Sequence, residues 1–165
     1  MASPILTPPA FEAKLCRPED FAARAAQLAR PRVFSNGCFD ILHRGHVTYL
    51  AQARQLGASL IVAVNSDDSV RRLGKGADRP VNRLADRMAL LAALECVSLV
   101  VSFAEDTPLA TILRCLPEIL VKGGDWPVDS IIGGREVLAA GGSVQSIPFV
   151  HASSTTALLE KIRSL

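Results

Sequence analysis

Two histidines lie three residues apart in the stretch "FSNGCFDILHRGHVTYL", directly after the first apolar run of the central chain. His43 and His46 flank Gly45, where a strand and a turn at Asn36-Gly37 are expected to lead into a helix. The start of a helix offers unpaired N–H groups and the positive end of its dipole to an anion. Two imidazoles add donors, and a glycine lets a ligand approach the backbone. The spacing therefore favours phosphate binding, whereas two histidines without a third ligand predict no metal site.

A basic segment, "NSDDSVRRLGKGADRPVNRLADR", follows the second apolar run. Its Gly-Lys-Gly triplet predicts a mobile loop, and the helix expected after the loop carries an arginine directed back toward the same crevice. We predict that three of its cations bind polyphosphate, namely Lys75, Arg79 and Arg87. A nucleic-acid surface would need interleaved aromatic side chains for base stacking, and this segment has none.

The stretch "VKGGDW" combines a cation, two glycines, a carboxylate and the only tryptophan of the chain. Lys122 stands at the end of a predicted strand, so its ammonium group can reach a ligand over a closely approaching backbone. Asp125, with Asp67 across the crevice, could accept hydrogen bonds from sugar hydroxyl groups. Trp126 is either a lid or a packing residue.

Hydroxyl side chains cluster at the start of the last predicted helix, in "HASSTTALLEKI". One of them would suffice as a helix cap, which is the simpler interpretation. Several hydroxyl groups together with the free N–H groups of a helix start also suit an anion. Two helix starts facing one crevice would fit a triphosphate.

The elements that must position these residues form a regular alternation. Five short apolar runs rich in β-branched residues are each followed by a helical pattern, beginning after Pro31. We therefore predict a Rossmann-like doubly wound α/β fold, with a five-stranded parallel sheet and helices on both faces. Residues 1–17 are predicted to form a Pro-rich N-terminal extension, and residues 18–165 a single domain. Ligands of such sheets bind beyond the carboxyl ends of the strands, where the strand order reverses.

Composition narrows the class of protein further. The 165 residues are 49% hydrophobic and carry a formal net charge of +2, which gives no electrostatic reason to expect nucleic acid as a partner. Four cysteines without a CxxC pair predict reduced thiols. No basic leader or apolar run of about 20 residues is present, so we expect a cytoplasmic protein that does not bind membranes. The phosphate-binding signatures GxxxxGK[ST] and GxGxxG after the first strand are also missing.

The stretch "GCFDILHRGH" and the late "SSTTALLEKI" together resemble the HxGH nucleotidyltransferase superfamily of the cytidylyltransferase type. Within it, "AVNSDDSV", "RPVNRLADRMALLAALE", "VVSFAEDTP", "LVKGGDW" and "REVLAAGG" are similar to the heptose 1-phosphate adenylyltransferases. The resemblance runs from about residue 21 to the C-terminus. It implies that AMP passes from ATP to D-glycero-β-D-manno-heptose 1-phosphate, giving pyrophosphate and ADP-heptose for lipopolysaccharide.

The resemblance also implies partners. Mg²⁺ would accompany ATP, the enzyme would be a homodimer, and a separate heptose kinase would supply the sugar phosphate, because this activity is fused to a sugar kinase in many bacteria. Cytidylyltransferases of this type tend to have an arginine where Phe149 stands, which disfavours CTP. Two alternatives remain: a cytidylyltransferase acting on glycerol 3-phosphate or a similar small phosphate, and a non-catalytic nucleotide sensor.

The motifs and the resemblance together predict three groups of site residues. The catalytic residues are His43, His46 and Lys122. The nucleotide-binding residues are Asn36, Gly37, Phe39, Asp40, Gly45, Lys75, Arg79, Arg87, Ser154, Thr155 and Thr156. The residues expected to bind the sugar phosphate are Asn65, Asp67, Gly123, Asp125 and Trp126.

Overall fold

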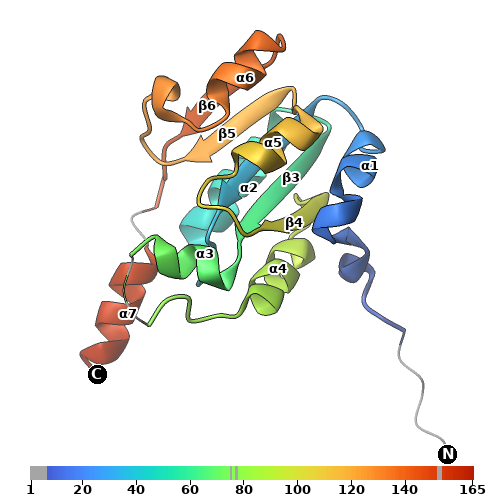
Figure 1. Ribbon diagram of the computed structural model, residues 1–165. Helices are drawn as coiled ribbons and strands as arrows, with labels where there is room; N and C mark the ends of the chain where they lie inside the picture. Colours follow the sequence, from blue (N-terminus) through green and yellow to red (C-terminus); the bar gives the residue numbers. More distant parts are fainter. Residues whose placement is uncertain (1–6, 75, 77, 152–153) are drawn as a thin grey trace, which may run out of the picture.

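The computed structural model describes residues 7–74, 76, 78–151 and 154–165, which form a parallel sheet with helices packed on both faces (Figure 1). The six strands are β1 (Leu15–Cys16), β2 (Arg32–Gly37), β3 (Ser59–Asn65), β4 (Leu99–Phe103), β5 (Ile119–Gly123) and β6 (Ser143–Ile147). The α-helices are α1 (Phe21–Ala26), α2 (Arg44–Gln55), α3 (Asp67–Arg72), α4 (Leu84–Ala93), α5 (Leu109–Cys115), α6 (Gly134–Ala139) and α7 (Thr155–Arg163). Short 3₁₀ helices span Ala10–Lys14, Pro18–Asp20 and Val128–Ser130. The predicted fold class is confirmed, with six strands in place of five.

The order of the strands in the sheet is β1-β4-β3-β2-β5-β6, and this order indicates where a ligand would bind. From β2 the chain builds outward through β3 and β4 on one side and through β5 and β6 on the other, so the order reverses between β2 and β5. The pairing of β2 with β3 continues to Gly37, whereas its pairing with β5 ends at Ser35. The carboxyl ends of β2 and β5 therefore separate, and the crevice between them is the expected ligand position for this kind of sheet.

The core consists of two layers, because successive strand residues point to opposite faces. On one face, Phe34, Ile61 and Val101 pack with residues of α1, α5 and α6. On the other face, Val33 and Val62, with their strand neighbours, pack with residues of α2 and α4. These strands are buried on both faces, which explains why they are apolar without alternation.

The first strand corrects the predicted boundary at residue 17. β1 pairs in parallel with β4, joining Leu15 to Val100 and Cys16 to Val101. Cys16 and Phe21 belong to the buried core, so the core begins before Pro31. A strand of two residues is too short to show a periodic pattern, which is why the sequence analysis assigned it to an extension.

The structure also differs from the sequence-based prediction in two short segments, one after β2 and one after β3. Asn36 and Gly37 end β2 and do not form the turn; the chain turns afterwards, with Phe39 at a left-handed φ of 47°. The segment after β3, expected to begin as a loop, folds first into α3, whose N-cap Ser66 accepts a hydrogen bond of 3.2 Å from the backbone N–H of Ser69. Among the described residues, none of the helices combines the length and apolar character needed to cross a bilayer.

The opposite end of the sheet is held together by Glu118, which precedes β5. Its carboxylate accepts three hydrogen bonds from Arg32, at 2.7, 3.0 and 3.2 Å, and another from Arg30. Burial raises the pKa of Glu118, but the hydrogen bonds from the two arginines outweigh burial and hold the pKa at about 2. The ion pair thus joins the amino ends of β2 and β5, whose carboxyl ends separate.

We predict that Glu118→Gln lowers the free energy of unfolding at pH 7 by about 1–3 kcal/mol, because Arg32 loses a charged acceptor while remaining buried. The native carboxylate stabilises the fold above pH 4.5, and that contribution is lost as the pH falls toward about 2. Urea unfolding at several pH values should therefore show the two proteins converging in acid. Asp68→Asn, in an exposed pair with Arg71, is the control and should change stability by less than about 0.5 kcal/mol. Equal stability of Glu118→Gln and the unsubstituted chain at pH 7 would contradict the prediction.

Candidate active site

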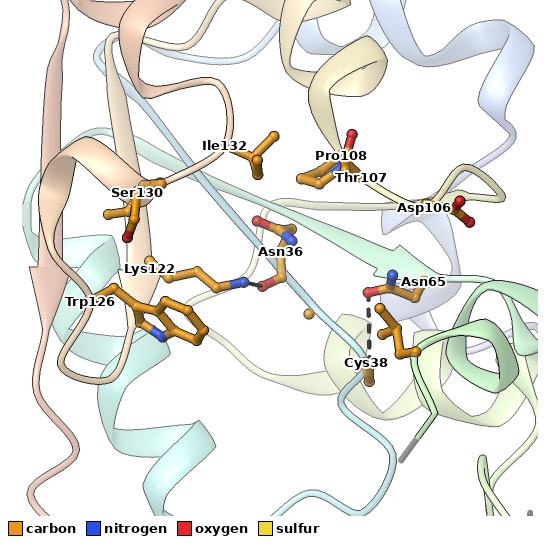
Figure 2. A pocket seen from close by; sticks show the side chains of 13 residues that line it. Asn36, Cys38, Asn65, Asp106, Thr107, Pro108, Lys122, Trp126, Ser130 and Ile132 are labelled. Carbon is orange, nitrogen blue, oxygen red and sulfur yellow. Dashed lines mark hydrogen bonds between the residues drawn. The ribbon is translucent and has the colours of Figure 1, made fainter. Parts of the chain in front are cut away.

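Three adjoining cavities lie over the carboxyl ends of the strands. The first, here called the strand-end cavity, has a volume of about 330 Å³ and is shown in Figure 2. The second, the histidine cavity, has about 270 Å³ and shares Asn36, Lys122 and Trp126 with the first. The third, the α7 cavity, has about 500 Å³ and shares His46 and Phe149 with the second. The three form a continuous crevice at the point where the strand order reverses.

The two histidines stand face to face at the start of α2. Their ring centroids are 3.8 Å apart with planes inclined by 23°, His43 being the N-cap of the helix and His46 lying in its first turn. His46 is further surrounded by the rings of Phe39, Tyr49 and Phe149. Burial lowers the pKa of His43; burial, and then the nearby His43, lower the pKa of His46 to about 4. Both imidazoles are therefore neutral at pH 7 and can act as aimed hydrogen-bond donors.

A side chain in place of the hydrogen of Gly45 would crowd the His43 ring. A Cβ atom at this position would lie 3.0 Å from Nδ1 of His43 and 3.4 Å from the carbonyl oxygen of His151. From the sequence alone, this glycine is predicted to let a ligand approach the backbone. In the structure the space above it is filled by the His43 ring, so glycine is what allows the two imidazoles to stack.

Lys122 reaches the crevice from the end of β5. Its Nζ donates a 3.3 Å hydrogen bond to the carbonyl oxygen of Asn36 and lies 6.0 Å from the centroid of the Trp126 ring (Figure 2). Gly123, the next residue, lines the histidine cavity. Asp125 is exposed and lines none of the three cavities, so the structure does not bring it to the sugar-binding position that the sequence predicted.

Asp40 and Arg79 form a buried ion pair in the wall of the crevice. The Asp40 carboxylate accepts a hydrogen bond from Nε of Arg79 and two more from the backbone N–H groups of Val81 and Asn82, at 2.8 and 2.9 Å. Asp40 thus holds the loop before α4 against the start of α2. Arg79 lines both the histidine and the α7 cavities, which keeps it a candidate for phosphate binding.

Arg87 does not reach the crevice as the sequence analysis expected. Its side chain is fully buried and donates to three carbonyl oxygens, those of Cys38, Asn65 and Asn82. It also donates a 2.8 Å hydrogen bond to Asp67, which lies outside the three cavities. Both residues, predicted to bind ligand, instead hold together the segments that carry the crevice. The position of Arg87 on its helix predicts that the side chain points toward the carboxyl ends of the strands. It does not show that backbone carbonyl oxygens bind the guanidinium group before it reaches the crevice.

The start of α7 forms the far wall of the α7 cavity. Ser154 caps the helix by accepting a 3.1 Å hydrogen bond from the N–H of Ala157, and Thr156 lines the cavity. Thr155 donates a 3.4 Å hydrogen bond to the carbonyl oxygen of Ile41, which links α7 to the loop before α2. The capping role of Ser154 is therefore observed, and the hydroxyl group of Thr156 stays a candidate for phosphate binding. Lys75, a predicted phosphate ligand, lies outside the described residues.

The strand-end cavity contains residues that the sequence analysis did not select. Asn65 was predicted; its amide donates a 3.0 Å hydrogen bond to Ser69, and its carbonyl oxygen faces the Cys38 thiol (Figure 2). The additional lining residues are Cys38, Leu73, Asp106, Thr107, Pro108, Ser130, Ile131 and Ile132. Asp106 and Thr107 follow β4, so the rule of inspecting each strand end could have found them. Ser130 to Ile132 follow no strand and carry no comparable signal.

The fold and the crevice define a class. The sequence profile of the cytidylyltransferase-like family matches residues 34–158, from β2 into α7. The chain belongs to this family.

Single members of this family can be compared with the chain directly. The chain is 60% identical, over 93% of its length and 96% of the relative's, to a D-beta-D-heptose 1-phosphate adenylyltransferase of Bordetella bronchiseptica. It is 57% identical over 87% of its length to the Bifunctional protein HldE of Shewanella sediminis, of which it spans only 31%. Among solved structures, a lipopolysaccharide core biosynthesis protein of Thermoplasma volcanium is 30% identical with a TM-score of 0.60, covering 74% of this chain and 98% of that one.

The partly buried His46 makes stability depend on pH in a defined window. Because the pKa of His46 falls from 6.5 to about 4 in the folded chain, the unfolded chain binds a proton between these values that the folded chain does not. Stability should therefore decrease as the pH falls from about 6.5 to 4, by at most about 2 kcal/mol between pH 7 and 5. Thermal unfolding should show a flatter dependence for His46→Asn. An equal slope in His46→Asn and the unsubstituted chain would disprove the assignment.

Proposed function

We propose that this chain transfers AMP from ATP to D-glycero-β-D-manno-heptose 1-phosphate, releasing pyrophosphate and forming ADP-heptose for lipopolysaccharide synthesis. The observation that carries the proposal is the meeting of His43, His46 and Lys122 with the start of α7 in one crevice. The near full-length similarity to a heptose 1-phosphate adenylyltransferase supports the choice of substrate.

The reaction needs charge neutralisation more than proton transfer. An oxygen of the sugar phosphate attacks the α-phosphorus of ATP, a new P–O bond forms, and the bond to the bridging oxygen of the pyrophosphate breaks. The nucleophile is already an anion, so no general base is required. The protein must bring two anions that repel each other into line, and must stabilise the charge that builds on the α-phosphate and the leaving group.

The side chains of the crevice suit these tasks. The neutral imidazoles of His43 and His46 would donate hydrogen bonds to the nucleotide phosphates, without the cost of burying two like charges 3.8 Å apart. Lys122, at the boundary between the strand-end and histidine cavities, would neutralise charge where the two substrates meet. Arg79 and Thr156 would hold the phosphate tail at the α7 cavity.

The strand-end cavity is the proposed sugar-phosphate position. It lies on the far side of Lys122 from the α7 cavity, and it contains the polar groups of Asn65, Thr107 and Ser130 for sugar hydroxyl groups. These groups take the role that the sequence analysis gave to Asp67 and Asp125. Trp126 borders this cavity as well as the histidine cavity, at the junction of the two proposed substrates.

Mg²⁺ fits this proposal only as a companion of the nucleotide. Within the described part of the chain, no group of three or more His, Cys, Asp or Glu side chains is arranged to hold a metal ion. Asp40, the carboxylate that lines the histidine cavity, is occupied by Arg79 and two backbone N–H groups. The triphosphate itself would carry the ion into the crevice, and no step above depends on a protein ligand to it.

Pyrophosphate release tests the proposal directly. Purified protein is offered ATP or CTP, each with heptose 1-phosphate or with glycerol 3-phosphate at equal concentration. We expect the fastest release with ATP and the heptose 1-phosphate. Faster CMP transfer to glycerol 3-phosphate would establish the alternative cytidylyltransferase activity, and release with none of the pairs would favour a nucleotide sensor.

The histidine assignment gives a second kinetic prediction. His46→Gln should lower turnover about 10²–10³-fold, because one aimed donor is lost from the transition state. Its circular dichroism spectrum should remain that of the unsubstituted chain. Asp125→Asn, on an exposed side chain outside the cavities, is the control and should keep turnover within about twofold. Full activity of His46→Gln would show that the imidazole does not contact the reacting phosphates.

The same proposal includes a homodimer in the cytoplasm, supplied with substrate by a heptose kinase. A second activity that works with this one is supported by the relative named as a bifunctional protein, of which this chain matches only 31%. Light scattering at micromolar concentration should give twice the chain mass of 17.6 kDa. A mass of one chain would refute the dimer.

A further inference from the structure

Phe149 is a half-exposed aromatic ring inside the crevice. It lies between β6 and α7, lines both the histidine and the α7 cavities, and leaves 43% of its surface exposed. A side chain of this size normally loses most of its exposure to packing. Because it lines two cavities, the exposed part of the ring is available to contact a ligand in the crevice.

The position of the ring is set by rigid neighbours. Its centroid lies 5.4 Å from that of Tyr49 and 6.3 Å from that of His46, with nearly perpendicular planes in both cases. Tyr49 is buried and lies 3.3 Å, hydroxyl to hydroxyl, from Ser35 of β2. The ring of Phe149 is thus oriented by residues whose own positions the sheet and α2 determine.

The two glycines after Lys122 bring a second ring to the same place. A Cβ atom on Gly123 would lie 3.0 Å from the tip of the Phe149 ring. A Cβ atom on Gly124 would lie 3.1 Å from Nε1 of Trp126 and 3.5 Å from Phe149. Trp126 is 50% exposed, so two partly exposed rings converge over a glycine backbone, beside the proposed phosphate site.

We propose that Phe149 is the stacking platform for the base of the nucleotide and that it sets the preference for a purine. This inference rests on the proposed function, which places the nucleotide in the histidine and α7 cavities. Stacking strengthens with the area of the base, so a purine gains more than cytosine from the same ring. A phenyl ring has no hydrogen-bonding group and reads no base edge. The preference should therefore distinguish purines from pyrimidines more strongly than it distinguishes ATP from GTP.

The test compares the binding of ATP, GTP and CTP to variants of this one position, in the absence of sugar phosphate so that no turnover occurs. Phe149→Leu keeps an apolar side chain but removes the aromatic face, whereas Phe149→Trp keeps an aromatic face. Binding is measured by calorimetry, and the fluorescence of Trp126, the only native tryptophan, gives a second readout for the leucine variant.

We expect Phe149→Leu to weaken ATP and GTP binding roughly tenfold, to weaken CTP binding less, and so to reduce the ratio of ATP to CTP affinity. Phe149→Trp should keep that ratio. A ring that only packs against its neighbours would change the melting temperature without changing the ratio. Unchanged ATP binding in Phe149→Leu overturns this inference and leaves the proposed function standing. Failure of the unsubstituted chain to bind any nucleotide overturns both.

Discussion

The crevice depends on one buried guanidinium group. Arg87 lies under the site without touching it, and its donors are taken up by the carbonyl oxygens that end β2 and β3 and by the loop before α4. Burying a cation is costly unless its donors are satisfied, and here the acceptors come from three segments distant in sequence. The satisfied state therefore exists only when these segments have their native arrangement. The charge of Arg87 can therefore be buried at low cost only when the three segments that form the crevice are in their native positions.

A comparable constraint governs the histidine pair. Two imidazoles stacked at 3.8 Å, one of them surrounded by aromatic rings, cannot both be charged without a large cost in free energy, so the protein keeps them neutral. A polyphosphate entering the crevice would bring negative charge and would favour protonation of the same rings. The apolar surroundings of His46 thus keep the histidine donors uncharged, and the positive charge in the wall of the crevice comes from Lys122 and from Arg79, which is paired with Asp40.

Much of this arrangement could be predicted from the sequence, and the failures have physical causes. The apolar strands predicted the parallel sheet, and the positions just after each strand predicted that His43, His46 and Lys122 would meet. Two elements were not predicted: β1 has only two residues, too few for a periodic pattern, and α3 lies in a polar, charged segment without an apolar run. The position of Arg87 was predicted wrongly because its acceptors are backbone carbonyl oxygens. Every residue has such an oxygen, so the sequence does not indicate which of them bind the guanidinium group.

The two-residue strand β1 has a consequence for the edge of the sheet. β4 would otherwise be an outermost strand, with one row of backbone N–H and C=O groups open to any extended chain that approached it. Leu15 and Cys16 occupy part of that row, and Lys14 fastens the segment by donating a 2.9 Å hydrogen bond to the carbonyl oxygen of Leu94. Part of the predicted N-terminal extension therefore covers an edge of the sheet that could otherwise pair with a strand of another molecule. We expect that removing Leu15 and Cys16 would open the backbone groups of β4 that they now pair with, and would leave that edge of the sheet available to an extended chain of another molecule.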